Sequence, residues 1–163
     1  MPSRRTGNWL GFVACMAALG AAFYAQYVLD LKPCHLCVFQ RVTVAAMAVA
    51  FGLAALNSSG RLRGTIYAGL IGITGLATLA TSGRHVWIQM QPPGSVASCG
   101  ADLKFMLEVF PLTEVILKVF KAGGECATID FTLLGLSIPA WVFVFALIAT
   151  AGGVWINLRR TPA

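Results

Sequence analysis

Four long stretches of this sequence contain no charged residue, and they constrain its fold more than any other feature. They cover residues 6–29, 42–60, 64–83 and 131–158. A helix rises about 1.5 Å per residue, so each stretch can cross the roughly 30 Å hydrocarbon layer of a bilayer. Lipid offers no hydrogen bonds to an exposed backbone, which favours helices as the spanning elements. The sequence therefore predicts an all-α integral membrane protein with a four-helix transmembrane bundle.

The composition supports a membrane protein and excludes two other classes. Of the 163 residues, 58% are hydrophobic and 11% are charged, whereas a soluble domain carries about 25% charged residues. A small water-soluble domain is disfavoured, and a disordered chain is excluded. We expect a single membrane domain over 1–163, with spans at about 9–29, 38–56, 65–83 and 133–156 and outer loops at about 30–37 and 84–132.

The distribution of charge predicts the orientation of the spans. One side carries six arginines and no acidic residue, namely Arg4, Arg5, Arg61, Arg63, Arg159 and Arg160, while all six acidic residues lie on the other side. By the positive-inside rule, both termini and the 57–63 connection are cytoplasmic and the two long loops are periplasmic. The net charge of +6 is thus read as a topology signal, and no nucleic-acid partner is expected. A cleaved signal peptide is the alternative for the first span, but its apolar run exceeds the usual length of about 7–15 residues.

Four of the five cysteines fall in the two predicted periplasmic loops. Cys34 and Cys37 lie in the first loop, Cys99 and Cys126 lie in the second, and Cys15 lies inside the first span. We expect Cys15 to be a small buried hydrophobe, whereas the other four face a compartment where disulfides persist. Four cysteines allow three pairings. Proximity in the sequence favours the pairs 34–37 and 99–126, and two pairs on one face suggest exchange between them.

The segment Cys34-His35-Leu36-Cys37 is expected to open the second span. Pro33 suits the first turn of a helix, and the positive end of the helix dipole there stabilises a thiolate. Arg41 would be the i+4 neighbour of Cys37 and could donate hydrogen bonds to a ligand oxygen at the membrane surface. The alternative is a passive disulfide, with Arg41 reaching lipid phosphates. No metal is expected, since c-type haem needs a histidine directly after the second cysteine and structural zinc needs four clustered ligands.

The second loop and the end of the third span carry further candidates. Mixed apolar and charged residues over 102–110 and 112–122 predict short interfacial helices in the second periplasmic loop; an ordinary packed lid is the alternative. His85 and Gln89, spaced i and i+4, are predicted to face the same pocket as Arg41 and to serve a carbonyl ligand that takes up electrons and protons. The alternative for His85 is a solvated residue that anchors the helix at the interface.

These motifs together resemble the DsbB family of disulfide bond formation proteins over nearly the whole chain. The matching elements are P-C-H-L-C-V-F-Q-R (33–41), R-H-V-W-I-Q (84–89), S-C-G (98–100), G-E-C-A (124–127) and L-L-G-L-S-I-P-A-W (133–141). The resemblance implies a membrane oxidoreductase of the bacterial inner membrane that reoxidises a periplasmic, thioredoxin-fold partner similar to DsbA. It also implies ubiquinone or menaquinone from the membrane quinone pool as electron acceptor.

The resemblance further implies a role for each site residue. Cys99 would be attacked by the partner, the Cys99–Cys126 pair would be reoxidised by Cys34–Cys37, and Cys37 would pass electrons to a quinone lined by Arg41, with His85 nearby. A DsbA-like partner has a potential of about −120 mV, which calls for an oxidant as strong as a respiratory quinone.

Three alternatives remain. One is a thiol/quinone oxidoreductase similar to vitamin K epoxide reductase, which also combines a four-span bundle with a C-x-x-C element. The second is a non-enzymatic membrane scaffold with structural disulfides. The third is a small transporter, which is disfavoured because spans one, three and four carry no charge at mid-bilayer.

Overall fold

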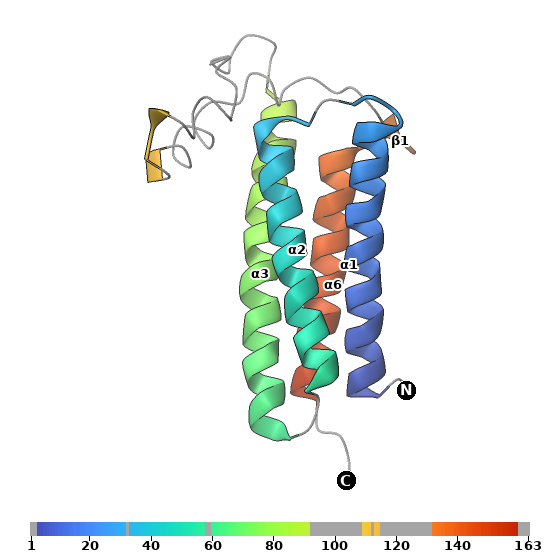
Figure 1. Cartoon of the computed structure of the whole chain (residues 1–163), viewed down its shortest axis with the longest axis vertical. Helices are drawn as coiled ribbons and strands as arrows, with labels where there is room; N and C mark the ends of the chain where they lie inside the picture. Colours follow the sequence, from blue (N-terminus) through green and yellow to red (C-terminus); the bar gives the residue numbers. More distant parts are fainter. Residues whose placement is uncertain are drawn as a thin grey trace.

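A computed structural model describes residues 3–31, 33–57, 60–91, 109–111, 113–114 and 132–159. Its elements are four long helices and a short hairpin: α1 (Arg4–Tyr27), α2 (His35–Leu56), α3 (Arg61–Gln89), β1 (Thr132–Leu133), β2 (Leu136–Ser137) and α6 (Ile138–Leu158). The four helices stand alongside one another, and α1 begins at the same end of the bundle at which α6 ends (Figure 1).

All four helices are long and apolar enough to cross a membrane. The predicted all-α, four-helix membrane bundle is therefore confirmed. The predicted interfacial helices fall almost entirely outside the described residues, and the sidedness of the spans stays a prediction.

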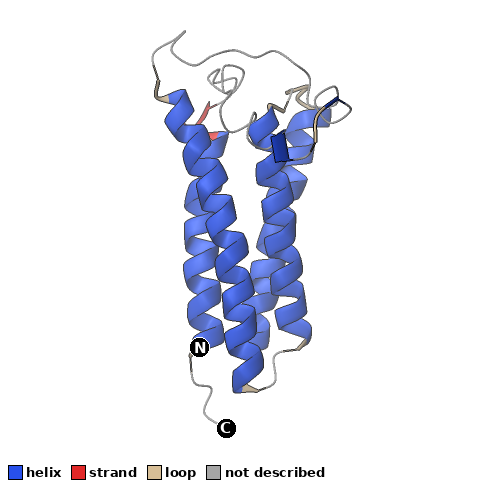
Figure 2. Cartoon of the chain, turned by 90° about the vertical axis from the view of Figure 1, so that its left-hand side faces the viewer, coloured by secondary structure: helices blue, strands red, loops and turns tan. Residues whose placement is uncertain are grey.

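The helices form a ring in which each one packs mainly against its neighbours. Helix α1 packs against α2, α2 against α3, and α3 against α6, while α1 and α6 make a smaller contact that closes the ring. The view turned by 90° shows the same long, parallel-sided bundle (Figure 2). Because every neighbouring pair is antiparallel, the four helix termini at each end of the bundle come close together.

The core of the bundle is organised around the ring of Phe51, which is 2% exposed. Gly11 of α1 and Gly153 of α6 lie against this ring, and a Cβ atom at either position would come within 2.6 Å of it. Small residues allow membrane helices to approach closely, because packing rather than water exclusion drives their association. Cys15 is fully buried in the same core, as expected for a small hydrophobe.

A polar clamp joins three helices at the end where α1 begins. The Arg4 guanidinium donates to the carbonyl oxygens of Gly60 and Arg159, each at 3.0 Å. Asn8 and Asn157 exchange two amide hydrogen bonds of 3.0 and 2.8 Å and are fully or almost fully buried. The positive charge of Arg4 was read as a signal for membrane orientation, but its side chain also has a structural role. It satisfies the backbone carbonyls of Gly60, directly before α3, and Arg159, directly after α6.

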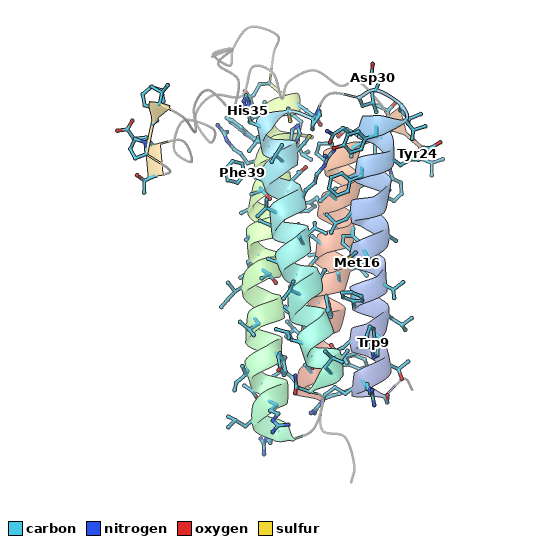
Figure 3. The ribbon with its side chains drawn as sticks, in the orientation of Figure 1. Trp9, Met16, Tyr24, Asp30, His35 and Phe39 are labelled. Atoms are coloured by element: carbon cyan, nitrogen blue, oxygen red, sulfur yellow. The ribbon has the colours of Figure 1, made fainter. Side chains whose placement is uncertain are left out.

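The opposite end, where α1 and α3 end and α2 and α6 begin, carries the first cysteine pair and is called the cysteine end here. After α1 the chain turns through Asp30, which has a left-handed φ of 52°. Figure 3 shows Asp30 and His35 at this end of the bundle. Helix α2 begins at His35 with Cys34 as its N-cap, so Pro33 precedes the cap and the prediction that it lies in the first turn is wrong.

The hairpin β1–β2 leads the chain into α6 at the cysteine end. Its two-residue turn has Leu134 at φ 53° and Gly135 at φ 80°, the left-handed pair that a tight type I′ hairpin requires. Thr132 pairs with Ser137 across the hairpin. As a result, Ser137, which directly precedes α6, is held both by the strand pairing and by the helix that follows.

Candidate redox site at the cysteine end

Cys34 and Cys37 lie together on the first turn of α2. The Cys34 side chain caps the helix, because its Sγ accepts a hydrogen bond of 3.4 Å from the Cys37 backbone N–H. The Cys34 thiol in turn donates to the Cys37 sulfur across 3.1 Å. The N-cap geometry thus brings two sulfurs, three residues apart in sequence, within reach of a disulfide.

His85 of α3 completes this cluster. Its Nε2 lies 3.7 Å from the Cys34 sulfur, and the side chain is only 2% exposed. The interpretation of His85 as a solvated anchor is therefore wrong. Its other ring nitrogen, Nδ1, is buried without a hydrogen-bond partner among the described residues. His85 thus brings a buried imidazole from α3 into contact with the cysteine pair.

The ligand atoms of Cys34, Cys37 and His85 all lie within 4.8 Å of one another. Such a set could hold a soft metal, but three donors are fewer than the four of a structural zinc site. The prediction that the protein uses no metal stays a prediction.

Arg41 is turned toward α1. One of its guanidinium nitrogens donates to the Gln26 side-chain carbonyl, and another donates to the Ala22 backbone carbonyl at 3.0 Å. The guanidinium carbon also lies 5.2 Å from the centroid of the Phe23 ring. Arg41 is thus partly buried and held by protein groups. The sequence spacing predicted only that Arg41 and Cys37 share a face of α2. The structure shows in addition that the Arg41 guanidinium binds to groups of the neighbouring helix α1.

Gln89, the last residue of α3, is bound to the start of α6. Its Oε1 accepts a hydrogen bond of 2.7 Å from the Ser137 hydroxyl. Ser137 is the N-cap residue of α6, yet its side chain makes no capping hydrogen bond, so its hydroxyl serves a contact between helices instead. Among the described contacts, no hydrogen bond joins Arg41, His85 and Gln89 to one another, and their predicted common pocket stays a prediction.

Gln40 is a further candidate for the site, which the sequence analysis did not single out. It lies three positions after Cys37 and is 4% exposed, and its Nε2 has no hydrogen-bond partner among the described residues. A buried amide without a partner is costly and calls for a ligand or a water molecule. The sequence contained a signal, because Gln40 is a polar residue with the apolar residues Leu36 and Val44 at i−4 and i+4.

Cys99 and Cys126 fall outside the described residues. Their pairing and their contact with Cys34 and Cys37 therefore stay predictions. The described hairpin begins at Thr132, six positions after Cys126, and enters α6 at the cysteine end. The chain that carries the second pair consequently leaves α3 and returns to α6 at the same end of the bundle as the first pair.

The chemistry of this site is that of a dithiol with polar neighbours at the boundary of a membrane bundle. Two thiols can give up two electrons and two protons as they form a disulfide. The buried imidazole of His85 is in contact with one sulfur, and imidazole is the side chain best suited to transfer protons near neutral pH. Fold and site together define a multi-pass membrane protein with a pair of neighbouring thiols at one end of its helix bundle.

Comparison with known proteins shows the family. Residues 4–156 match the family described as disulfide bond formation protein DsbB. A disulfide bond formation protein B from Methylococcus capsulatus is 42% identical over 162 residues, which cover 98% of this chain and 99% of the relative. Proteins of the same name from Chromohalobacter salexigens (44% identity; 87% of this chain and 83% of the relative) and Chromobacterium violaceum (39%; 97% and 95%) are also similar. No solved structure matches the chain. The chain belongs to the DsbB family of disulfide bond formation proteins.

Proposed function

We propose that this protein reoxidises a DsbA-like, thioredoxin-fold protein of the periplasm and passes the electrons to a membrane quinone. The observation that carries this proposal is the cluster of Cys34, Cys37 and the buried His85 at one end of a membrane-spanning bundle, in which the Cys34 sulfur contacts both of the other residues. A dithiol at the boundary of a bilayer is accessible to an oxidant dissolved in lipid. Membership of the DsbB family supports the same direction of electron flow.

The residues around the cysteine pair fit the polar head of a quinone. Gln40 and His85 both have buried nitrogen atoms without a described partner, and Arg41 supplies a positive charge that is held by neutral groups. A quinone supplies two carbonyl oxygens that accept hydrogen bonds and become more negative on reduction. Oxidation of the Cys34/Cys37 dithiol releases two electrons and two protons, which balances reduction of one ubiquinone or menaquinone to its quinol.

The second cysteine pair is assigned to the exchange with the partner. In this scheme the Cys99–Cys126 disulfide oxidises the reduced partner through a mixed disulfide at Cys99. The Cys34–Cys37 disulfide then reoxidises the resulting dithiol. This order assigns the soluble partner to the long segment between α3 and β1 and the lipid-soluble acceptor to the bundle. It requires the protein to lie in the inner membrane with both cysteine pairs in the periplasm.

The proposal is tested with purified protein in lipid nanodiscs, a reduced DsbA-like protein and a soluble quinone analogue. We expect continuous oxidation of the partner in the wild type and its loss in Cys37→Ser and Cys99→Ser. Cys15→Ala is the matched control, because Cys15 is buried in the core, and it should keep its turnover. Full turnover in Cys37→Ser would contradict the proposed electron route, and turnover without quinone would contradict the acceptor.

A further inference from the structure

We propose that Gln26 of α1 is a positioning residue for Arg41. It fixes the guanidinium at the cysteine end and, because its amide is neutral, leaves the positive charge of Arg41 available to the electron acceptor. This inference rests on the proposed function of Arg41 toward a quinone and adds a residue and a charge requirement to it.

Three groups of α1 hold the guanidinium of Arg41. The Gln26 side-chain carbonyl and the Ala22 backbone carbonyl each accept a hydrogen bond from a different terminal nitrogen. The Phe23 ring lies beside the guanidinium, with 5.2 Å between the guanidinium carbon and the ring centroid. Of the two hydrogen bonds, only the one to Gln26 is accepted by a side chain. A substitution at Gln26 can therefore remove this bond without disturbing the helix backbone.

The fixed position matters because an arginine side chain is otherwise highly mobile. Its many side-chain rotamers carry conformational entropy, which is lost when a bound ligand fixes the side chain. Gln26 and Ala22 hold the side chain in place before any ligand arrives. Preorganised donors are the ones that bind a developing negative charge most strongly.

The neutrality of the Gln26 amide also matters. A carboxylate at this position would form a bidentate ion pair with the guanidinium, the strongest contact that arginine makes. That ion pair would cancel the charge of Arg41. An amide accepts a hydrogen bond with nearly the same shape and leaves the charge intact. Among the described contacts of Arg41, the acceptors are an amide, a backbone carbonyl and an aromatic ring, so no carboxylate offsets its charge there.

The pattern of the sequence agrees with this role. Gln26 is the one side-chain amide in the second half of α1, which otherwise ends in small and aromatic residues. A polar side chain inside a membrane span is expensive unless it has a partner or a function. Here the partner is Arg41, on the neighbouring helix.

The test measures quinone-dependent oxidation of a reduced DsbA-like protein by the full-length protein in nanodiscs. The variants are Gln26→Ala, which removes the acceptor, and Gln26→Glu, which keeps the shape and adds a charge. Tyr24→Phe, at an exposed position in the same turn of α1, is the control. We expect the KM for quinone to rise about tenfold in both Gln26 variants, as for the loss of about 1.4 kcal/mol of binding. The KM for the protein partner should stay unchanged.

A double variant separates positioning from a general structural effect. In the Arg41→Ala background, Gln26→Ala should have no further effect on the KM for quinone, because Gln26 acts through Arg41. Equal losses from Gln26→Ala with and without Arg41 would overturn the proposal, and so would a wild-type KM in Gln26→Glu. Absence of quinone-dependent turnover in the wild type would instead refute the proposed function itself, which keeps the two failures distinct.

Discussion

The paired amides of Asn8 and Asn157 allow a quantitative prediction about the stability of the bundle. The two side chains exchange hydrogen bonds of 3.0 and 2.8 Å between α1 and α6. A hydrogen bond between membrane helices contributes about 0.6 kcal/mol on average and up to about 1.7 kcal/mol, so the reciprocal pair should contribute about 1–3 kcal/mol. Replacing either residue by alanine removes both bonds and leaves the other amide buried without this partner.

A double-mutant cycle measures this contribution directly. The free energy of unfolding would be followed for Asn8→Ala, Asn157→Ala and the double variant in mixed micelles titrated with a denaturing detergent. The fluorescence of Trp9, which directly follows Asn8, and of Trp155, which lies two positions before Asn157, contributes to the signal that reports the transition. We expect the double variant to lose at least about 1 kcal/mol less than the sum of the single variants, because the two side chains share the same bonds. Asn157 also donates to the Gly153 carbonyl at 2.8 Å, but this bond lies within α6 and drops out of the cycle.

The refuting result is additivity of the two substitutions within about 0.3 kcal/mol. Such a result would mean that the two amides do not stabilise one another. Turnover at moderate temperature should be retained in all three variants, since the pair lies at the opposite end of the bundle from the cysteine pair.

Three further predictions concern the core and the cysteine end. Phe51→Ala should lower the free energy of unfolding by about 3–5 kcal/mol, measured in the same detergent titration, because the ring fills the space beside Gly11 and Gly153; a loss below about 1 kcal/mol would contradict that packing. Gly75→Val should lower the yield of folded, monodisperse protein in size-exclusion chromatography, because any Cβ at position 75 overlaps the Thr150 side chain. Gly69→Ala is the control and should leave this yield unchanged, because a Cβ at position 69 meets open space. The 2.7 Å bond from Ser137 is expected to orient Gln89. Ser137→Ala should therefore raise the KM for quinone by a few-fold and leave the KM for the protein partner constant, and Ser137→Thr should restore the KM for quinone. An unchanged KM for quinone in Ser137→Ala would contradict a role of this bond in orienting Gln89 toward the quinone.

The architecture of the bundle could be predicted from the sequence because lipid imposes a simple rule. A span must be largely apolar where it crosses the lipid, so the charge-free stretches indicate where the helices lie, and the four described helices are long and apolar enough to cross a membrane. Helix ends are less constrained, because the polar boundary of the bilayer tolerates both helix and loop. Helix α2 accordingly begins at His35, before the expected start at about residue 38, because the Cys34 side chain serves as its N-cap.

The contacts of the site residues were harder to predict than their presence. Spacing along one helix indicates which residues share a face, but the rotation of that helix against its neighbours decides what the face contacts. Arg41 and His85 illustrate the difference, since the first meets Gln26 on α1 and the second meets Cys34 on α2. Ser137 shows a further limit. A serine directly before a helix favours a capping hydrogen bond from its side chain, yet the Ser137 hydroxyl bonds to Gln89 instead.

The central claim is that the Cys34/Cys37 dithiol delivers electrons to a quinone, and a single-turnover measurement tests it most directly. The Cys99→Ser/Cys126→Ser variant, reduced and freed of reductant, would be mixed with a quinone analogue in nanodiscs. Quinol would be quantified by absorbance, and the Cys34–Cys37 disulfide by thiol alkylation and mass spectrometry. We predict one quinol formed for each Cys34–Cys37 disulfide, and none when Cys37→Ser is added. Quinol formation that persists without Cys37, or a reduced dithiol that stays reduced in excess quinone, would contradict the account.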